Sequence, residues 1–140
     1  RFNNYIARYH SRHLDLMDVL SMYQARATAP LDQIAQLLGY PGKLGMSGAH
    51  VWDAYLDGRI DAIRNYCETD VANTYLVFLH FQLMRGLLTP EAHAREVDLA
   101  HGTLARSEAA HWAEFVAAWS RGAPPVGTRG GRRPRAGPRR

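Results

Sequence analysis

The feature that most constrains the fold is the spacing of apolar side chains, which recur at intervals of three and four residues through most of the chain. The longest such stretch predicts a helix from about Asp61 to Arg85, ended by Gly86. No stretch shows the alternation with a period of two that a free-standing sheet requires. The chain is therefore predicted to be mostly helical, with at most one strand. The side chains that follow this spacing along the long helix are Ile63, Cys67, Val71, Thr74, Tyr75, Phe78 and Gln82.

Shorter elements are predicted around the long helix. A short strand around residues 13–16 leads into a helix that reaches about Tyr23. The glycine-rich segment 40–48 is predicted to be a loop. Helices are also predicted over 30–38, over 50–56, and from Thr89 and Ser107 onward.

Charge divides the chain into two parts. Residues 1–120 carry ten Lys and Arg against thirteen Asp and Glu, whereas residues 121–140 carry seven arginines and no acidic residue, which together give the net charge of +4. The second part is rich in arginine, glycine and proline and has too few apolar side chains to offset the entropy of ordering it. We therefore predict one folded domain over 1–120 and a disordered tail over 121–140 that can bind phosphates without sequence preference.

The sequence also limits the setting in which the protein works. A single cysteine, Cys67, excludes an intramolecular disulfide framework and a cysteine-rich zinc site, so a reducing, cytoplasmic location is predicted. The longest apolar run, residues 76–84, is far shorter than the roughly 20 residues of a membrane span, and no membrane partner is expected. The chain begins at Arg1 with neither methionine nor a signal segment, which suggests that an upstream segment has been left out.

The pair of side chains with the clearest chemical potential is Tyr66 and Asp70, which stand one turn apart on the predicted long helix. A carboxylate held on a helix can bind a divalent metal ion, and a phenol one turn away can hydrogen-bond a metal-bound water. The same spacing also fits a tyrosine in the core beside a solvated acid, so the pair by itself leaves both interpretations open.

Two further patterns have a simpler explanation. His10 and His13, with Asp15 and Asp18 nearby, have a spacing that resembles a metal site, but nothing else in the chain completes it and surface histidines are favoured. The segment Gly42–Gly48 contains Lys43 and could approach a phosphate through its backbone N–H groups. It lacks the ending of a nucleotide-binding P-loop, and a flexible connection is the favoured interpretation.

Four segments that occur in order carry a family resemblance: HLDLMDVLS from His13, LDQIAQLLG from Leu31, PGK from Pro41 and NYCETDV from Asn65. Together they resemble the predicted 3′–5′ exonucleases related to the proofreading domain of family B DNA polymerases. The resemblance covers about residues 10–119. It implies an α/β ribonuclease H-like fold and an exonuclease of the DEDD type, tyrosine subclass.

The resemblance implies specific roles. Asp70 would bind one of two Mg²⁺ or Mn²⁺ ions and Tyr66 would orient the attacking water, whereas Asp15 follows the family's second motif and is interpreted as structural. The family uses four carboxylates. Three of them, an Asp-x-Glu pair and a second-motif aspartate, have no counterpart here, and the central sheet that supports them is also largely missing.

The chain is thus interpreted as the C-terminal part of a metal-dependent exonuclease that hydrolyses phosphodiester bonds at the 3′ ends of single-stranded DNA, with RNA as the other possible substrate. We expect it to be inactive alone, because one aspartate cannot hold two metal ions. The alternative is a non-catalytic helical module that binds nucleic acid or a partner protein. The sequence gives no indication of oligomeric state.

Overall fold

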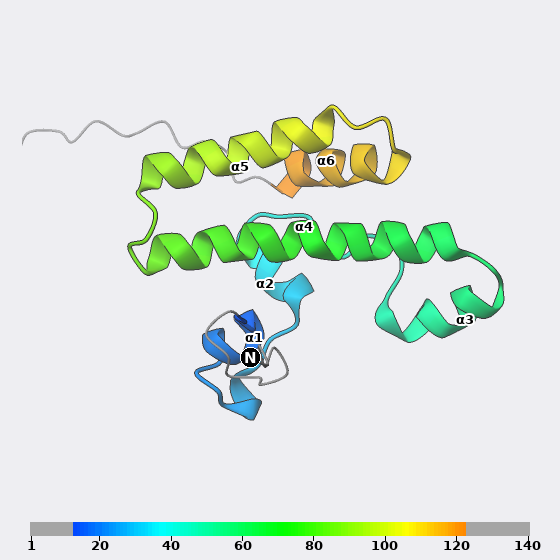
Figure 1. The fold of residues 1–140 in the computed structure, drawn as a ribbon, viewed down its shortest axis with the longest axis horizontal. Helices are drawn as coiled ribbons and strands as arrows, with labels where there is room; N and C mark the ends of the chain where they lie inside the picture. Colours follow the sequence, from blue (N-terminus) through cyan, green and yellow to red (C-terminus); the bar gives the residue numbers. More distant parts are fainter. Residues whose placement is uncertain (1–12, 123–140) are drawn as a thin grey trace, which may run out of the picture.

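The computed structural model describes residues 13–122, which form helices and loops without a strand (Figure 1). For this part of the chain, the prediction of a mostly helical structure is confirmed. The helices are α1 (Leu16–Leu20), α2 (Leu31–Leu37), α3 (Val51–Leu56), α4 (Ile60–Met84), α5 (Pro90–Ala105) and α6 (Ala110–Gly122), and the short 3-10 helices are η1 (Ala25–Ala27) and η2 (Gly48–His50).

The strand predicted around residues 13–16 is wrong. Asp15 is instead the N-cap of α1, where its carboxylate accepts a hydrogen bond of 3.2 Å from the backbone N–H of Asp18. The helix also ends earlier than predicted, at Leu20, because Met22 and Tyr23 have the positive φ angles of 52° and 60°.

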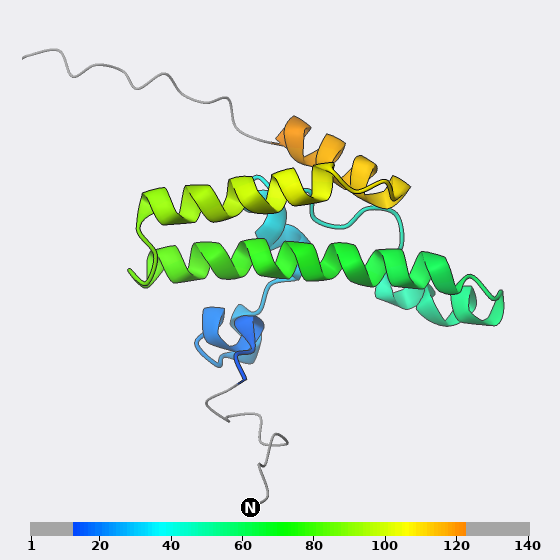
Figure 2. The same ribbon diagram turned by 45° about the horizontal axis from the view of Figure 1, so that its top comes forward.

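The long helix and its successor form an antiparallel hairpin, in which α5 runs alongside α4 in both views (Figures 1 and 2). The predicted limits of α4 are confirmed to within one residue, and Gly86 follows it with a φ of 70°. Thr89 caps α5 by accepting a hydrogen bond of 3.2 Å from the N–H of Ala92, and Pro90 is its first residue. Although α4 has 25 residues, neither it nor any other helix within 13–122 is apolar enough to cross a membrane.

The core lies where α2, α4 and α6 meet. Its aromatic side chains contact one another edge to face: the ring of Trp119 has its centroid 5.4 Å from that of Tyr40 and 6.1 Å from that of Phe115. The helix that begins near Ser107 in the prediction begins at Ala110, and it contributes two of these rings. The buried residues of this cluster are Ala35, Tyr40, Leu76, Val77, Leu79, Phe115 and Trp119.

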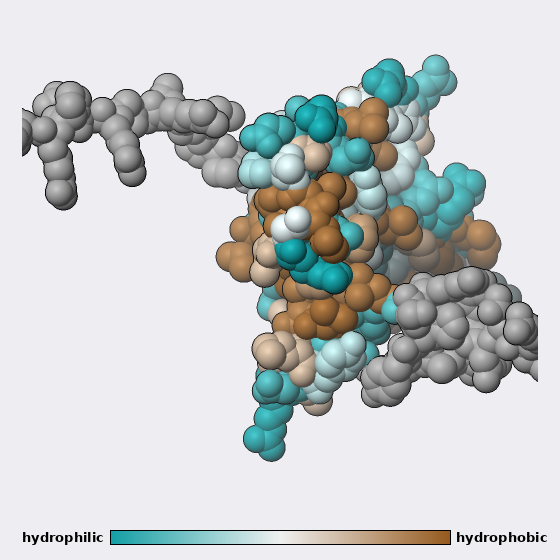
Figure 3. Space-filling view, turned by 60° about the vertical axis from the view of Figure 1, so that its left-hand side comes forward, coloured by the Kyte–Doolittle hydropathy of each residue, from teal (hydrophilic) through white to brown (hydrophobic). Residues whose placement is uncertain are grey.

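The side chains that follow the helical spacing along α4 are not its buried residues. Val71 and Tyr75 are 69% and 42% exposed, because α2, the following loop and α6 pack on another side of the helix. Exposed apolar surface is also visible at the end where α4 turns into α5, as brown patches between hydrophilic ones (Figure 3). The residues of α4 that are buried are Thr69, Asn73, Leu76, Val77, Leu79 and Phe81.

Two sequence predictions fall outside the described residues. The predicted disordered tail lies there except for Arg121 and Gly122, which finish α6. His10 of the histidine pair also lies outside the described range.

Candidate active site

Tyr66 and Asp70 lie one turn apart on α4, and both side chains are half-buried. The Asp70 carboxylate lies close enough to the Tyr66 phenol to raise the pKa of that phenol. The structure therefore brings the two residues together as their spacing predicts, and both occupy the regular part of a 25-residue helix.

The surroundings of Tyr66 keep its phenol protonated. Burial contributes most to raising the pKa of Tyr66, and the hydrogen bond to Asp70 and the charge of Asp70 raise it further, while Lys43 acts in the opposite direction. The net shift is upward from a value already near 10. Tyr66 is consequently a hydrogen-bond donor throughout the neutral pH range.

The glycine-rich loop after α2 is anchored beside this pair. Asn73, which is buried on α4, donates a hydrogen bond of 2.8 Å to the Gly42 carbonyl and accepts one of 3.3 Å from the Gly42 N–H. The carboxylate of Asp32 on α2 accepts a hydrogen bond of 2.6 Å from the backbone N–H of Lys43. Gly42 and Lys43 are thus held by groups in two other elements, Asn73 in α4 and Asp32 in α2.

Glycine at position 42 is required by this arrangement. Its φ is 68°, and a Cβ atom there would collide with the carboxylate of Asp32. The backbone of Gly42 can therefore approach α2 and α4 at once, which leaves the next residue, Lys43, beside Tyr66.

Lys43 is the residue of this site whose role the sequence analysis missed. Its Nζ lies 5.8 Å from the centroid of the Tyr66 ring, and it is the only lysine in the chain. The signal was present in the PGK segment, but nothing in the sequence indicated which helix that loop contacts. The structure thus joins one cation to the phenol and the carboxylate, a combination suited to an anionic substrate.

A cleft of about 500 Å³ opens next to Tyr66. Asn65 is one of the residues that line it, and the side-chain Oδ1 of Asn65 is buried without a hydrogen-bond partner. The ionisable side chains among its lining residues are His50, Arg59, Tyr66, His111 and Glu114. The lining residues are Leu44, Gly45, Met46, His50, Arg59, Ala62, Asn65, Tyr66, Thr69, His111 and Glu114.

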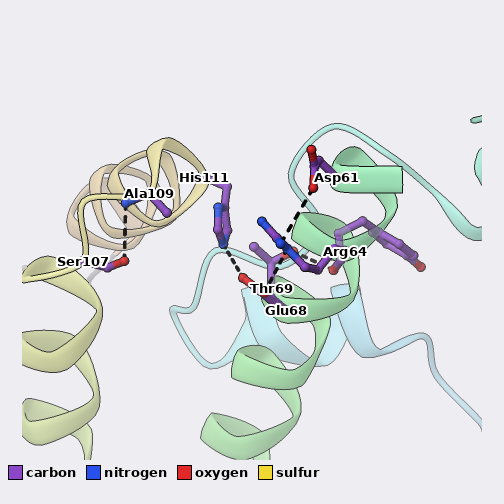
Figure 4. Close-up of polar contacts among 8 residues, drawn as sticks. Asp61, Arg64, Glu68, Thr69, Ser107, Ala109 and His111 are labelled. Atoms are coloured by element: carbon purple, nitrogen blue, oxygen red, sulfur yellow. Dashed lines mark hydrogen bonds and ion pairs between the residues drawn. The ribbon is translucent and has the colours of Figure 1, made fainter. Parts of the chain in front are cut away.

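The wall of this cleft contributed by α6 is fixed to α4 by a network of polar side chains (Figure 4). His111 Nε2 lies 2.7 Å from Glu68 Oε2, and Arg64 Nε lies 3.5 Å from the other oxygen of that carboxylate. Arg64 also pairs with Asp61 at 3.7 Å. The basic groups that line the cleft are His50, Arg59 and His111, and of these Arg59 pairs with Asp57 at 3.2 Å and His111 with Glu68.

The described residues do not by themselves form a two-metal site. Within 13–122 no group of three or more His, Cys, Asp or Glu side chains is placed to hold a metal ion. Asp70 can supply one carboxylate ligand, but two ions about 4 Å apart need several such ligands. Asp15 caps α1 instead of joining a metal site with His13.

Comparison with known proteins identifies one relationship. The family model for predicted 3′–5′ exonucleases related to the exonuclease domain of PolB matches residues 1–119. This match confirms the resemblance seen in the sequence. No curated protein and no solved structure matches the chain.

Proposed function

This chain belongs to the family of predicted 3′–5′ exonucleases related to the exonuclease domain of PolB, and from that premise we propose that it is the C-terminal part of a metal-dependent exonuclease that acts in the cytoplasm on the 3′ ends of single-stranded DNA. The observation that supports this most directly is the grouping of Tyr66, Asp70 and Lys43 inside the matched region. We assign residues 1–120 to this exonuclease domain.

Each of the three side chains has a role that its chemistry favours. Asp70 would help to hold a Mg²⁺ or Mn²⁺ ion, because carboxylate oxygens are the ligands that these ions prefer. Tyr66, as a protonated phenol, would orient the attacking water through a hydrogen bond. Lys43 places its positive charge against a phosphate oxygen of the substrate. The bound ions would supply charge neutralisation at the phosphate and a more acidic water.

The remaining carboxylates and the sheet that carries them belong to the part of the proposed α/β ribonuclease H-like fold that residues 13–122 do not contain. The exposed stripe on α4 supports this proposal. Val71 and Tyr75, at 69% and 42% exposure, are apolar side chains on the solvent side of a helix, and Val71 directly follows Asp70. A sheet packed on this stripe would cover these two side chains.

We predict that the 140-residue chain alone does not degrade DNA. One aspartate cannot hold two metal ions. The purified chain is incubated with 3′-labelled single-stranded DNA or RNA in Mg²⁺ or Mn²⁺, with the Asp70→Ala variant as the control. Metal-dependent release of nucleotides that Asp70→Ala abolishes would show that this chain holds a complete site.

The absence of a complete donor set within 13–122 also favours the alternative function, a helical module that binds nucleic acid or protein without catalysis. The two functions predict different activities for a longer chain, in which this sequence is joined to a segment that carries the first two carboxylate motifs. The exonuclease proposal predicts that this longer chain is active. A folded longer chain that binds single-stranded DNA but releases no nucleotides would support the binding module instead.

In the same longer chain, Lys43→Met is expected to lower turnover about 10²-fold, the usual effect of removing one preorganised group that stabilises developing charge. The substitution keeps the long aliphatic stem but removes the cation beside Tyr66. Arg95→Met, an exposed cation on α5, is the matched control and should leave turnover unchanged. Equal turnover in the two variants, both with wild-type melting temperatures, would remove Lys43 from the active site.

A further inference from the structure

A second cluster of ionisable side chains lies away from Tyr66 and Asp70, where the loop after α2 meets α4 and α5. His80 on α4 is its centre. Its Nδ1 lies 2.9 Å from the Tyr40 hydroxyl and 3.1 Å from Nε2 of His93 on α5. The two imidazole rings meet edge to face, with centroids 4.3 Å apart and an interplanar angle of 84°.

The hydrogen-bonding capacity of this cluster is exceeded at one atom. An imidazole Nδ1 carries either one proton or one lone pair, so it makes one well-formed hydrogen bond. His80 Nδ1 has two partners within hydrogen-bond distance, Tyr40 and His93, and it can satisfy only one of them fully. A cation placed among the three atoms would satisfy both nitrogens and the oxygen together.

The spacing of these atoms is suited to a metal ion. At metal–donor distances of about 2.0–2.1 Å, two donors at right angles about an ion lie about 2.9 Å apart. The two contacts of His80 Nδ1 measure 2.9 Å and 3.1 Å. Right angles between nitrogen and oxygen donors are typical of the tetragonal geometry that Cu²⁺ and Ni²⁺ prefer.

We propose that His80 Nδ1, His93 Nε2 and the Tyr40 hydroxyl oxygen form a binding site for a late first-row divalent cation, Cu²⁺ or Ni²⁺. Three protein donors leave further coordination positions for water. Because both histidines are only partly buried, these positions have access to solvent.

The electrostatics of the cluster are compatible with binding. A metal ion needs the neutral form of histidine. Burial, followed by the charge of His93, lowers the pKa of His80, and a hydrogen bond with the Leu76 backbone opposes this only in part.

The bound ion would join three elements that are separate along the chain. Tyr40 belongs to the loop that also carries Lys43, while His80 and His93 belong to the two helices of the hairpin. An ion at this point would hold the start of the loop against α4 and α5. Occupancy is therefore expected to stabilise the fold without changing the residues around Asp70.

The test measures the melting temperature of the full chain with Ni²⁺, which does not oxidise the exposed thiol of Cys67. At about 100 times its Kd, Ni²⁺ is expected to raise the Tm by about 10 °C. His93→Gln should remove this shift. Tyr40→Phe, which keeps the ring in the core, should weaken Ni²⁺ binding by about 10-fold in isothermal titration calorimetry.

The matched control replaces His10 and His13 with Gln, because their spacing is the other candidate for metal binding in the sequence. This variant should bind Ni²⁺ with unchanged affinity. His80→Gln, checked for folding by circular dichroism, is the second test of the site. No Ni²⁺-dependent shift in the wild type would overturn the proposal, and so would a shift that survives His80→Gln and His93→Gln or that disappears in the His10 and His13 variant.

Discussion

Asp70→Asn is expected to have the largest effect on activity, measured in a chain that also carries the first two carboxylate motifs. Turnover should fall by more than the roughly 10²- to 10³-fold that the loss of a single preorganised hydrogen-bond donor costs. Asparagine keeps the size of the side chain but removes the negative charge that would face the metal ion. Raising the Mn²⁺ concentration should therefore restore part of the activity.

Tyr66→Phe provides the matched comparison. It leaves the carboxylate in place and removes only the hydrogen bond to the water, so the expected loss is smaller, about 10²-fold. Mn²⁺ should hardly affect it. Because the Tyr66 phenol is half-buried beside Asp70, the melting temperature of both variants is measured along with turnover. Wild-type turnover in two stably folded variants would mean that these residues only pack the helix.

Asn73→Leu is expected to have the largest effect on stability, a loss of about 2–5 kcal/mol in the free energy of unfolding. Asn73 is 1% exposed, and its side chain satisfies both the N–H and the carbonyl of Gly42. Each buried backbone group left without a partner costs about 1–3 kcal/mol. Urea unfolding of the full chain measures the difference.

Thr74→Ala is the control for this experiment. Thr74 is the next residue on α4, but it is exposed and its hydroxyl bonds only to the Asp70 carbonyl at 2.8 Å. The free energy of unfolding of this variant should stay within about 0.5 kcal/mol of the wild-type value. Equal stability of Asn73→Leu and Thr74→Ala would show that the contact with Gly42 does not hold the loop in place.

Loss of the hydrogen bonds between Asn73 and Gly42 should also disturb the candidate active site. Lys43 follows Gly42 directly, and its position over Tyr66 depends on the bonds from Asn73 and Asp32. In the longer chain, the folded fraction of Asn73→Leu should therefore show a reduced turnover close to that of Lys43→Met.

The sequence by itself determined the features that depend on neighbours within one helical turn. The limits of α4 and the start of α5 follow from a run of helical spacing, from Gly86 and from the cap at Thr89. The juxtaposition of Tyr66 and Asp70 is of the same kind, because a helix places residues four apart on one side. Local capping also explains the one wrong strand, since Asp15 forms a hydrogen bond three residues ahead.

Only the tertiary structure decided which elements meet. Periodicity showed that α4 has an apolar stripe, but the side that became buried was the one against which α2 and α6 pack, and Val71 stayed exposed. Lys43 reaches Tyr66 across 23 positions of sequence, and His80 reaches Tyr40 across 40. Such contacts depend on the packing of whole helices rather than on the residues beside them in the chain, and for this reason no local pattern predicted them.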